Sequence, residues 1–143
     1  MKHVLLINAA LTILFLSETY TGSTHEKRIA DAALYPLPPG SRLLQDLSFL
    51  AFTLDQVEII MPTRKPRGRQ LTRAQKAANR RIARRRVRIE HVNRSVKRCR
   101  IVRDICRLRK AGSQDLVMEV CCALHNFRVR LIPWQPQGGI LPR

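Results

Sequence analysis

The feature that most constrains this fold is the strongly basic segment at residues 80–97, which contains a single acid, Glu90. At about 100° of rotation per helical residue, offsets of four, seven and eleven residues nearly complete whole turns. One narrow helix face therefore carries Arg86, Glu90, Asn93 and Lys97. A lone carboxylate among cations is typical of a metal ligand at a phosphate-binding site. The simpler interpretation is a surface ion pair between Arg86 and Glu90, which contributes little stability.

An apolar stripe beside that face indicates that the helix is anchored by its neighbouring surface. Its members are Ile82, Ile89, Val92, Val96 and Cys99. Thr72, with Gln75 three residues later, forms a capping box and predicts where the helix begins. The helix can run to Lys110, and Gly112 is a reasonable stop.

The net charge of +17 is unevenly distributed along the chain. Residues 64–110 hold 20 of the 27 basic residues, against only two acids, Glu90 and Asp104. Such a segment repels itself unless phosphates neutralise it. We therefore expect a polyanionic partner, with nucleic acid as the first candidate and an anionic membrane surface as the second. With 143 residues and 45% hydrophobic content, the chain has room for one modest domain.

The four cysteines have neither a CxxC pair nor the spacing of a secreted disulfide framework. They are Cys99, Cys106, Cys121 and Cys122. Reduced, core-facing thiols are the simplest interpretation. A metal site built from Cys121, Cys122 and His125 is disfavoured, because adjacent residues point to different sides of a helix.

The first sixteen residues have two interpretations. A basic start, an apolar run and small polar residues after it resemble a secretory signal peptide. Asn8 interrupts that run, and the run is too short to span a membrane. The alternative is a pair of buried strands at residues 3–8 and 11–18. The residues alone leave this an even contest.

Two further strands are expected after the chain is broken by Pro36, Pro38, Pro39 and Gly40. Residues 41–46 form the first and end on a carboxylate, Asp46, and residues 56–61 form the second. Catalytic residues favour the ends of strands in α/β sheets. Asp46 alone, however, is equally well explained as a turn or cap acid.

Two more helices complete the predicted α/β fold. The first is capped by Thr24 and reaches about Leu34, and the second is capped by Ser113 and covers residues 114–129. The apolar face of the second contains Leu116, Val117, Val120, Cys121 and Leu124. We divide the chain into a sheet region (residues 1–62), a basic linker (63–71), a helical part of the same domain (72–132) and a flexible tail (133–143).

Asp46 and Glu90 together suggest a shared chemistry. A strand-end aspartate and a helix-borne glutamate in a strongly basic surface suit two carboxylates that share Mg²⁺ at a scissile phosphate. The isolated histidines His25, His91 and His125 are interpreted as packing or hydrogen-bonding residues. Trp134, in the tail, could stack on a base.

Several motifs resemble DDE transposases of bacterial insertion sequences. Arg86, Glu90 and Lys97 are spaced like the R-E-K signature of that family, in which the glutamate is the last of three metal-binding acids. Other similar stretches are GSTHE at residues 22–26, LQDLSF at 44–49, KPRG at 65–68 and LHNF at 124–127. The similarity therefore covers most of the chain.

This resemblance implies a partial ribonuclease H-like domain that binds Mg²⁺ or Mn²⁺ and cleaves and transfers DNA strands. By position, Asp46 is the second acid and Glu90 the third, and both are the implied metal ligands. The implied DNA-binding residues are Arg86, Lys97, Arg85, Asn93, Arg94, Lys65 and Arg67. The resemblance implies DNA as the partner and no interaction with a membrane. It also allows a homo-oligomer that assembles on transposon ends. The implied location is cytoplasmic and nucleoid-associated.

The departures from the family pattern shape the expectation of activity. The first acid belongs on a strand before residue 3, Glu26 stands where Asp is usual, and Ala83 stands where many relatives have Tyr. We therefore expect an amino-terminally truncated transposase that is inactive alone, with residues 1–16 as strands. The alternatives are a non-catalytic basic module that binds DNA or RNA, and an exported cationic protein that acts on membranes.

Overall fold

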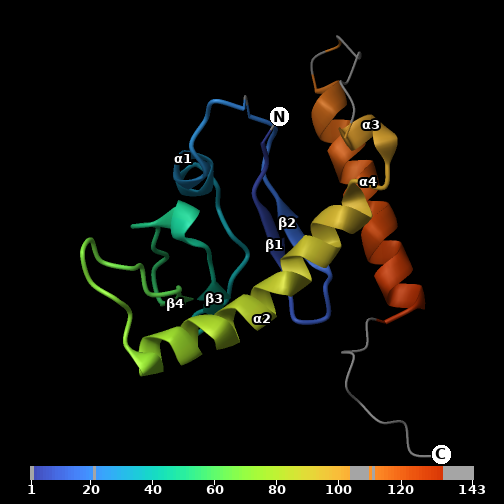
Figure 1. The fold of residues 1–143 in the computed structure, drawn as a ribbon. Helices are drawn as coiled ribbons and strands as arrows, with labels where there is room; N and C mark the ends of the chain where they lie inside the picture. The colour runs from blue at the N-terminus through green and yellow to red at the C-terminus, as the bar shows by residue number, and fades with distance from the viewer. Residues whose placement is uncertain (1, 21, 104–109, 111, 134–143) are drawn as a thin grey trace, which may run out of the picture.

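The computed structural model describes residues 2–20, 22–103, 110 and 112–133. They form a small mixed α/β structure in which short strands accompany two long helices (Figure 1). The elements follow the order β1 (Leu5–Ile7), β2 (Ile13–Leu16), α1 (Glu26–Asp31), β3 (Arg42–Leu44), the 3-10 turn η1 (Leu47–Phe49), β4 (Glu58–Ile60), α2 (Arg73–Val96), α3 (Arg100–Arg103) and α4 (Ser113–Leu131).

Strands β1 and β2 form an antiparallel pair, as expected for residues 3–8 and 11–18. Leu5 lies opposite Leu16, and Leu6 lies opposite Phe15. The Asn8 side chain closes the connection, because its Oδ1 accepts hydrogen bonds from the backbone N–H groups two and four residues later. The interpretation of this region as strands is therefore confirmed.

Strands β3 and β4 form a second, parallel pair. Arg42 lies opposite Glu58, and their side chains form an ion pair with a distance of 3.0 Å between Nε and Oε2. Gly40 precedes β3 with a φ of 79°, a left-handed conformation that glycine adopts without steric cost. Within the described residues the two pairs are separate sheets, with no strand hydrogen-bonded to both.

Helix α1 is shorter than expected and begins one residue later than a Thr24 cap implies. His25 is the N-cap, and its Nδ1 accepts a hydrogen bond from Lys27 N at 3.2 Å. The cap assignment to Thr24 is therefore wrong, because the neighbouring imidazole takes that role. Ile29 and Ala30 anchor the helix, since both are buried.

Helix α2 begins as predicted but ends earlier. The capping box is present in both directions: the Thr72 side chain accepts from Gln75 N, and the Gln75 side chain accepts from Thr72 N. The expectation of a continuous helix to Lys110 is wrong, because α2 ends at Val96 and a turn leads into α3. Val96 is buried in the apolar cluster that α2 shares with the hairpin and α4, and the chain turns after this contact. Residues 104–109 lie outside the described residues.

Helix α4 packs against α2 on a face that only partly matches the predicted one. Its buried residues are Met118, Cys121, Cys122 and His125, and Val117 packs against the same cluster. The predicted apolar face is therefore correct at Val117 and Cys121 and wrong at Leu116, Val120 and Leu124, which are exposed. Its N-cap is Gly112, with a φ of 74° and no side-chain cap, so the assignment of this role to Ser113 is also wrong.

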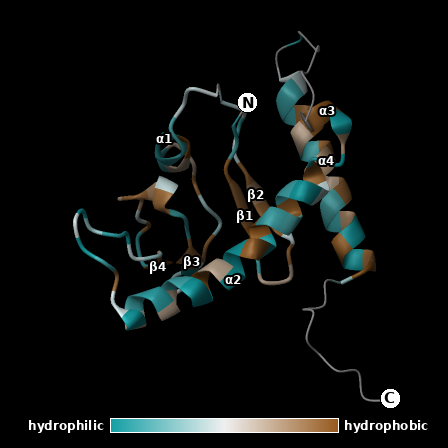
Figure 2. Ribbon diagram, in the orientation of Figure 1, coloured by the Kyte–Doolittle hydropathy of each residue, from teal (hydrophilic) through white to brown (hydrophobic). Residues whose placement is uncertain are grey.

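Two apolar clusters hold these elements together, and Figure 2 shows the brown, hydrophobic strands beside the largely teal first half of α2. The first cluster joins the β1–β2 hairpin to α2 and α4, and its buried members are Leu11, Ile13, Val92, Val96, Met118, Cys121 and Cys122. The second joins Val4 to α1 and Phe52. In the part of the chain that is described, no helix is long and apolar enough to cross a membrane.

Candidate phosphate-handling cavity

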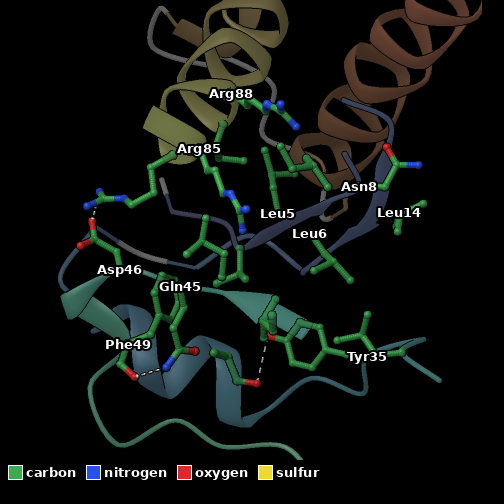
Figure 3. Close-up of a pocket in the computed structure, with 18 of the residues that line it drawn as sticks. Leu5, Leu6, Asn8, Leu14, Tyr35, Gln45, Asp46, Phe49, Arg85 and Arg88 are labelled. Atoms are coloured by element: carbon green, nitrogen blue, oxygen red, sulfur yellow. Dashed lines mark hydrogen bonds and ion pairs between the residues drawn. The ribbon is translucent and has the colours of Figure 1, made fainter. Parts of the chain in front are cut away.

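A cavity of about 650 Å³ lies where β1, β3 and α2 come together. Its floor is apolar, with contributions from Leu5, Leu6 and Leu43. Its helical wall contains the polar residues Arg85, Arg86, Arg88, Glu90 and Asn93. Figure 3 shows Arg85 and Arg88 extending from α2 above Leu5 and Leu6 of β1, with Asp46 at the edge of the same space.

Asp46 reaches this cavity because β3 ends two residues before it. Its backbone is extended, and its Oδ1 accepts a hydrogen bond from Leu47 N at 2.6 Å, which makes Asp46 the N-cap of η1. The strand-end position is therefore as expected. The role of turn cap, which the sequence offered as the simpler explanation, is present as well.

Arg86 crosses from α2 to Asp46. Its NH2 group donates to Asp46 Oδ2 at 2.5 Å, and the two side chains are 35% and 41% exposed. The contact joins residues that are forty positions apart. Among the described residues, Arg86 does not form the surface ion pair with Glu90 that the simpler interpretation predicted. Its side chain points toward the end of β3 instead.

Glu90 lies one helical turn after Arg86, and its exposed side chain lines the same cavity. Asn93 follows on the same face and is half-buried. The fold therefore brings five of the nominated residues to one cavity: Asp46, Arg85, Arg86, Glu90 and Asn93. Among the described residues, no group of three or more acids, histidines or cysteines is placed to hold a metal ion.

Four other nominated residues lie outside the lining of the cavity. Arg94 is exposed near the end of α2, and Lys97 is its C-cap residue. Lys65 and Arg67 lie in the exposed segment before α2. These four residues therefore do not share the cavity with the two carboxylates.

The sequence interpretation missed several polar residues of the cavity, among them Gln45, His3 and Arg88. Gln45 is 7% exposed, and its Nε2 donates to the carbonyl oxygens of Phe49 and Phe52, each at 3.3 Å. Its Oε1 is buried without a partner among the described residues. His3 also lines the cavity, and burial lowers the pKa of its imidazole. The signal available in the sequence for Gln45 was an amide side chain next to the strand-end carboxylate.

His125 fixes the position of α2 relative to the β1–β2 hairpin. The imidazole is 4% exposed, and its Nδ1 lies 2.7 Å from Ser95 Oγ while its Nε2 lies 2.8 Å from Leu11 O. The next residue, Asn126, bonds the backbone of Ile13 in both directions. The expectation that His125 is a packing and hydrogen-bonding residue agrees with these contacts.

A cavity that combines carboxylates with arginines has the chemistry needed to handle a phosphate-bearing ligand. The sequence matches the family model of the DDE superfamily endonucleases over residues 1–126. The chain belongs to that family, so the resemblance drawn from its motifs is confirmed. The family is one of transposase-like nucleases, which act on DNA and generally use divalent metals. No curated protein and no solved structure matches the chain.

Proposed function

We propose that the cavity between β3 and α2 is part of a metal-dependent DNA-cleavage site. The supporting observation is that Asp46 and Glu90, distant in sequence, line one cavity together with the arginines of α2. Carboxylate oxygens are the ligands that Mg²⁺ and Mn²⁺ favour. The Asn93 side chain offers a further amide oxygen in the same wall.

In this proposal Asp46 and Glu90 are the metal ligands. A bound Mg²⁺ or Mn²⁺ supplies Lewis-acid polarisation of a phosphodiester and a more acidic water. Arg86 holds Asp46 in position and competes for one of its oxygens, because Oδ2 already accepts from the guanidinium. Since only two carboxylates line the cavity, we expect the described residues alone to support little cleavage.

The basic residues are proposed to bind the DNA backbone. Arg85 and Asn93 line the same cavity as the carboxylates. Arg94, Lys97, Lys65 and Arg67 would contact phosphates farther along the strand. Arginine can hold a phosphate with two parallel hydrogen bonds, whereas lysine acts as a point charge.

The finer parts of the proposal come from the resemblance. They are a ribonuclease H-like arrangement of the domain, strand transfer during transposition, a homo-oligomer on transposon ends, and a cytoplasmic, nucleoid-associated location. The mixed α/β structure is compatible with the first of these, and the family match supports a role in transposition. The oligomer and the location rest on the resemblance alone. The division into regions at residues 62, 71 and 132 belongs to the same proposal.

The test is Mn²⁺ binding to the full chain, measured by isothermal titration calorimetry without DNA. We expect Glu90→Gln and Asp46→Asn each to weaken binding at least about tenfold, because a ligating oxygen is lost from a sparse donor set. Glu119→Gln is the matched control, since Glu119 is an exposed acid on α4, outside the cavity lining. Equal binding by all four proteins would refute the proposed metal site.

A nicking assay with supercoiled DNA complements this titration. We expect cleavage by the 143-residue chain to be weak in Mg²⁺ or Mn²⁺, and any cleavage to disappear in Glu90→Ala. Robust cutting by the native chain would contradict the expected low activity. Cutting that survives in Glu90→Ala would place catalysis elsewhere.

The second candidate is a non-catalytic module that binds DNA or RNA. The observation that favours it is the exposed basic surface of α2, which includes Arg80, Arg81, Arg84, Arg85 and Arg94. Both candidates predict that affinity for nucleic acid falls steeply with salt. They differ in metal dependence, because this one predicts that Glu90→Gln changes neither Mn²⁺ nor DNA binding.

A further inference from the structure

Helix α4 carries a second apolar face, on the side opposite its buried one. The residues of this α4 stripe recur at offsets of four, eight, eleven and fifteen from the first, so at about 100° per residue they fall within a sector of about 80°. They are Leu116, Val120, Leu124, Phe127 and Leu131, and each is 50–65% exposed. Exposed apolar surface that is concentrated on one element marks an interaction site.

The α4 stripe is separate from the proposed cleavage site. Helix α4 lies at the edge of the molecule, on the side far from β3 and β4 (Figure 1). Its main contacts are with α2, α3 and β2, and its buried residues are used there. None of the described residues of α4 lines the cavity that contains Asp46 and Glu90. A partner on this stripe would therefore leave the cavity open.

The charges of α4 differ from those of the chain as a whole. Residues 113–131 contain two acids, Asp115 and Glu119, and two arginines, Arg128 and Arg130, so their formal charges cancel. The whole chain, in contrast, has a net charge of +17. Nucleic acids and anionic membranes bind where cations are in excess. The α4 stripe therefore favours a polypeptide partner over either polyanion.

The positions of these charges specify how a second copy would be oriented. The acids lie in the first half of α4 and the arginines in the second. Glu119 and Arg130 lie along the same flank of the stripe, about 20° apart around the helix axis. Both are exposed, and neither forms an ion pair with another described residue. Antiparallel copies would bring Glu119 of each next to Arg130 of the other, whereas parallel copies would align like charges.

The apolar residues of the stripe match each other in the same antiparallel arrangement. Val120 lies four residues before Leu124, and Phe127 lies three residues after it. Leu116 lies eight residues before Leu124, and Leu131 lies seven residues after it. A two-fold axis near Leu124 would therefore pair Val120 with Phe127 of the second copy. It would likewise pair Leu116 with Leu131, as a symmetric interface built from one patch requires.

We propose that two copies of the chain associate through the α4 stripe, with their α4 helices antiparallel about a two-fold axis near Leu124. The occupant of the stripe is thus a second copy of this chain. The inference goes beyond the proposed cleavage function, because the association requires neither metal nor DNA. It gives the chain a dimer that forms before any DNA is bound.

The expected association is weak. The contact from Leu116 to Leu131 extends over about 22 Å, at about 1.5 Å per residue. A single helix pair of this length falls below the standard interface size of about 1,600 Å². The net positive charge of each copy also opposes association. We therefore expect a Kd of about 1–100 µM.

Sedimentation equilibrium of the full chain, without metal or DNA, is the measurement, from about 1 to about 200 µM so that the expected Kd is bracketed. Leu124→Glu should raise the Kd at least about a hundredfold, because two like charges would meet at the two-fold axis. Leu34→Glu is the matched control, since Leu34 is 94% exposed and lies outside α4. The control should leave the Kd unchanged, and both variants should keep the circular dichroism of the native chain.

An exchange of charges tests the antiparallel orientation. Glu119→Arg should weaken association about tenfold, because two repulsive contacts with Arg130 replace two attractive ones. Arg130→Glu should have the same effect for the same reason. The double variant that combines both substitutions should recover the native Kd to within about twofold, because each pair is attractive again.

Four results would overturn the proposal. A native chain that stays monomeric at every concentration would show that the α4 stripe does not pair, and a dimer that persists in Leu124→Glu would place the interface elsewhere. A double variant as weak as the single ones would exclude the antiparallel arrangement. Binding to anionic phospholipid vesicles by a monomeric chain, lost in Leu124→Glu, would identify a membrane surface as the occupant instead. None of these outcomes depends on whether Asp46 and Glu90 bind metal.

Discussion

Arg86 should restrain metal binding at Asp46, and this restraint can be measured. The guanidinium lies 2.5 Å from Asp46 Oδ2, so a metal that uses this oxygen must displace it. Both side chains are more than one-third exposed, at 35% and 41%. Solvent screening limits such a pair to about 0.5–1 kcal/mol. Since about 1.4 kcal/mol corresponds to a tenfold change in an equilibrium constant, releasing Asp46 should tighten binding about two- to fivefold.

The perturbation is Arg86→Gln, and the measurement is the Kd for Mn²⁺ by calorimetry at fixed ionic strength. Arg85→Gln is the matched control, because it removes the same charge from the same cavity wall and leaves Arg86 on Asp46. It corrects for the general effect of removing a cation near a metal. Asp46→Asn combined with Arg86→Gln tests whether the gain passes through Asp46.

We expect the Arg86→Gln variant to bind Mn²⁺ about two- to fivefold more tightly than the Arg85→Gln variant does. This difference in affinity should vanish in the Asp46→Asn background. Identical effects of the two arginine substitutions would refute the competition. So would an excess that persists without the Asp46 carboxylate. The free energy of unfolding should fall by no more than about 1 kcal/mol in Arg86→Gln, because the pair is half-exposed.

Three further predictions concern the framework around the cavity. His125→Phe should lower the free energy of unfolding by about 1–3 kcal/mol in urea titrations, because it leaves the buried Leu11 carbonyl oxygen without its partner and removes the contact with Ser95. His91→Phe, at an exposed position of α2, should change it by less than about 0.5 kcal/mol, and equal costs would refute the linking role. Burial raises the pKa of Cys122 to about 11, so its thiol should resist iodoacetamide at pH 8, which is roughly half a unit below the pKa of a free cysteine. After unfolding in urea the same thiol should react, and peptide mass spectrometry measures both outcomes. Equal labelling before and after unfolding would contradict this prediction. Hydrogen bonding by Thr19 lowers the pKa of Asp115 below its ordinary value. The stabilisation that this carboxylate contributes is therefore complete above the ordinary pKa and is lost as the pH falls through the lower folded pKa. Asp115→Asn should flatten the acid limb of the unfolding curve, and an unchanged limb would refute this account.

Local signals in the sequence predicted where elements begin better than where they end. The capping box of Thr72 and Gln75 requires only residues that are three apart, so the sequence contains the whole interaction. The end of α2 at Val96 depends instead on burial against the hairpin and α4. A continuous helical pattern holds no information about that distant contact, which explains why the predicted helix was too long.

The face of α4 shows the same limit. Leu116 and Leu124 are more hydrophobic than His125, so periodicity placed the leucines on the apolar face and left the histidine with only a general packing or hydrogen-bonding role. In the structure His125 is buried because Ser95 and Leu11 O provide its hydrogen-bond partners. Polar partners supplied by other elements can override hydrophobicity, and the sequence does not reveal those partners.

The sequence predicted which residues form the candidate site better than it predicted the contacts among them. The resemblance nominated Asp46 and Glu90, and the fold brings both to one cavity. It did not indicate that Arg86 would turn to Asp46, because Glu90, one turn away on the same helix, is an equally good local partner. Gln45 was missed because its unpartnered oxygen becomes apparent only once the loop after β3 is in place.

The separation of Asp46 and Glu90 depends on how firmly α2 is held to the β3–β4 side. At its far end, α2 is fixed to the hairpin through buried Val92 and Val96. Toward the β3–β4 side, its contacts include the exposed hydrogen bonds of Asn79 with Thr63 and the half-exposed pair of Arg86 with Asp46. Exposed polar contacts contribute little stability, so this half of the cavity is the less rigid one.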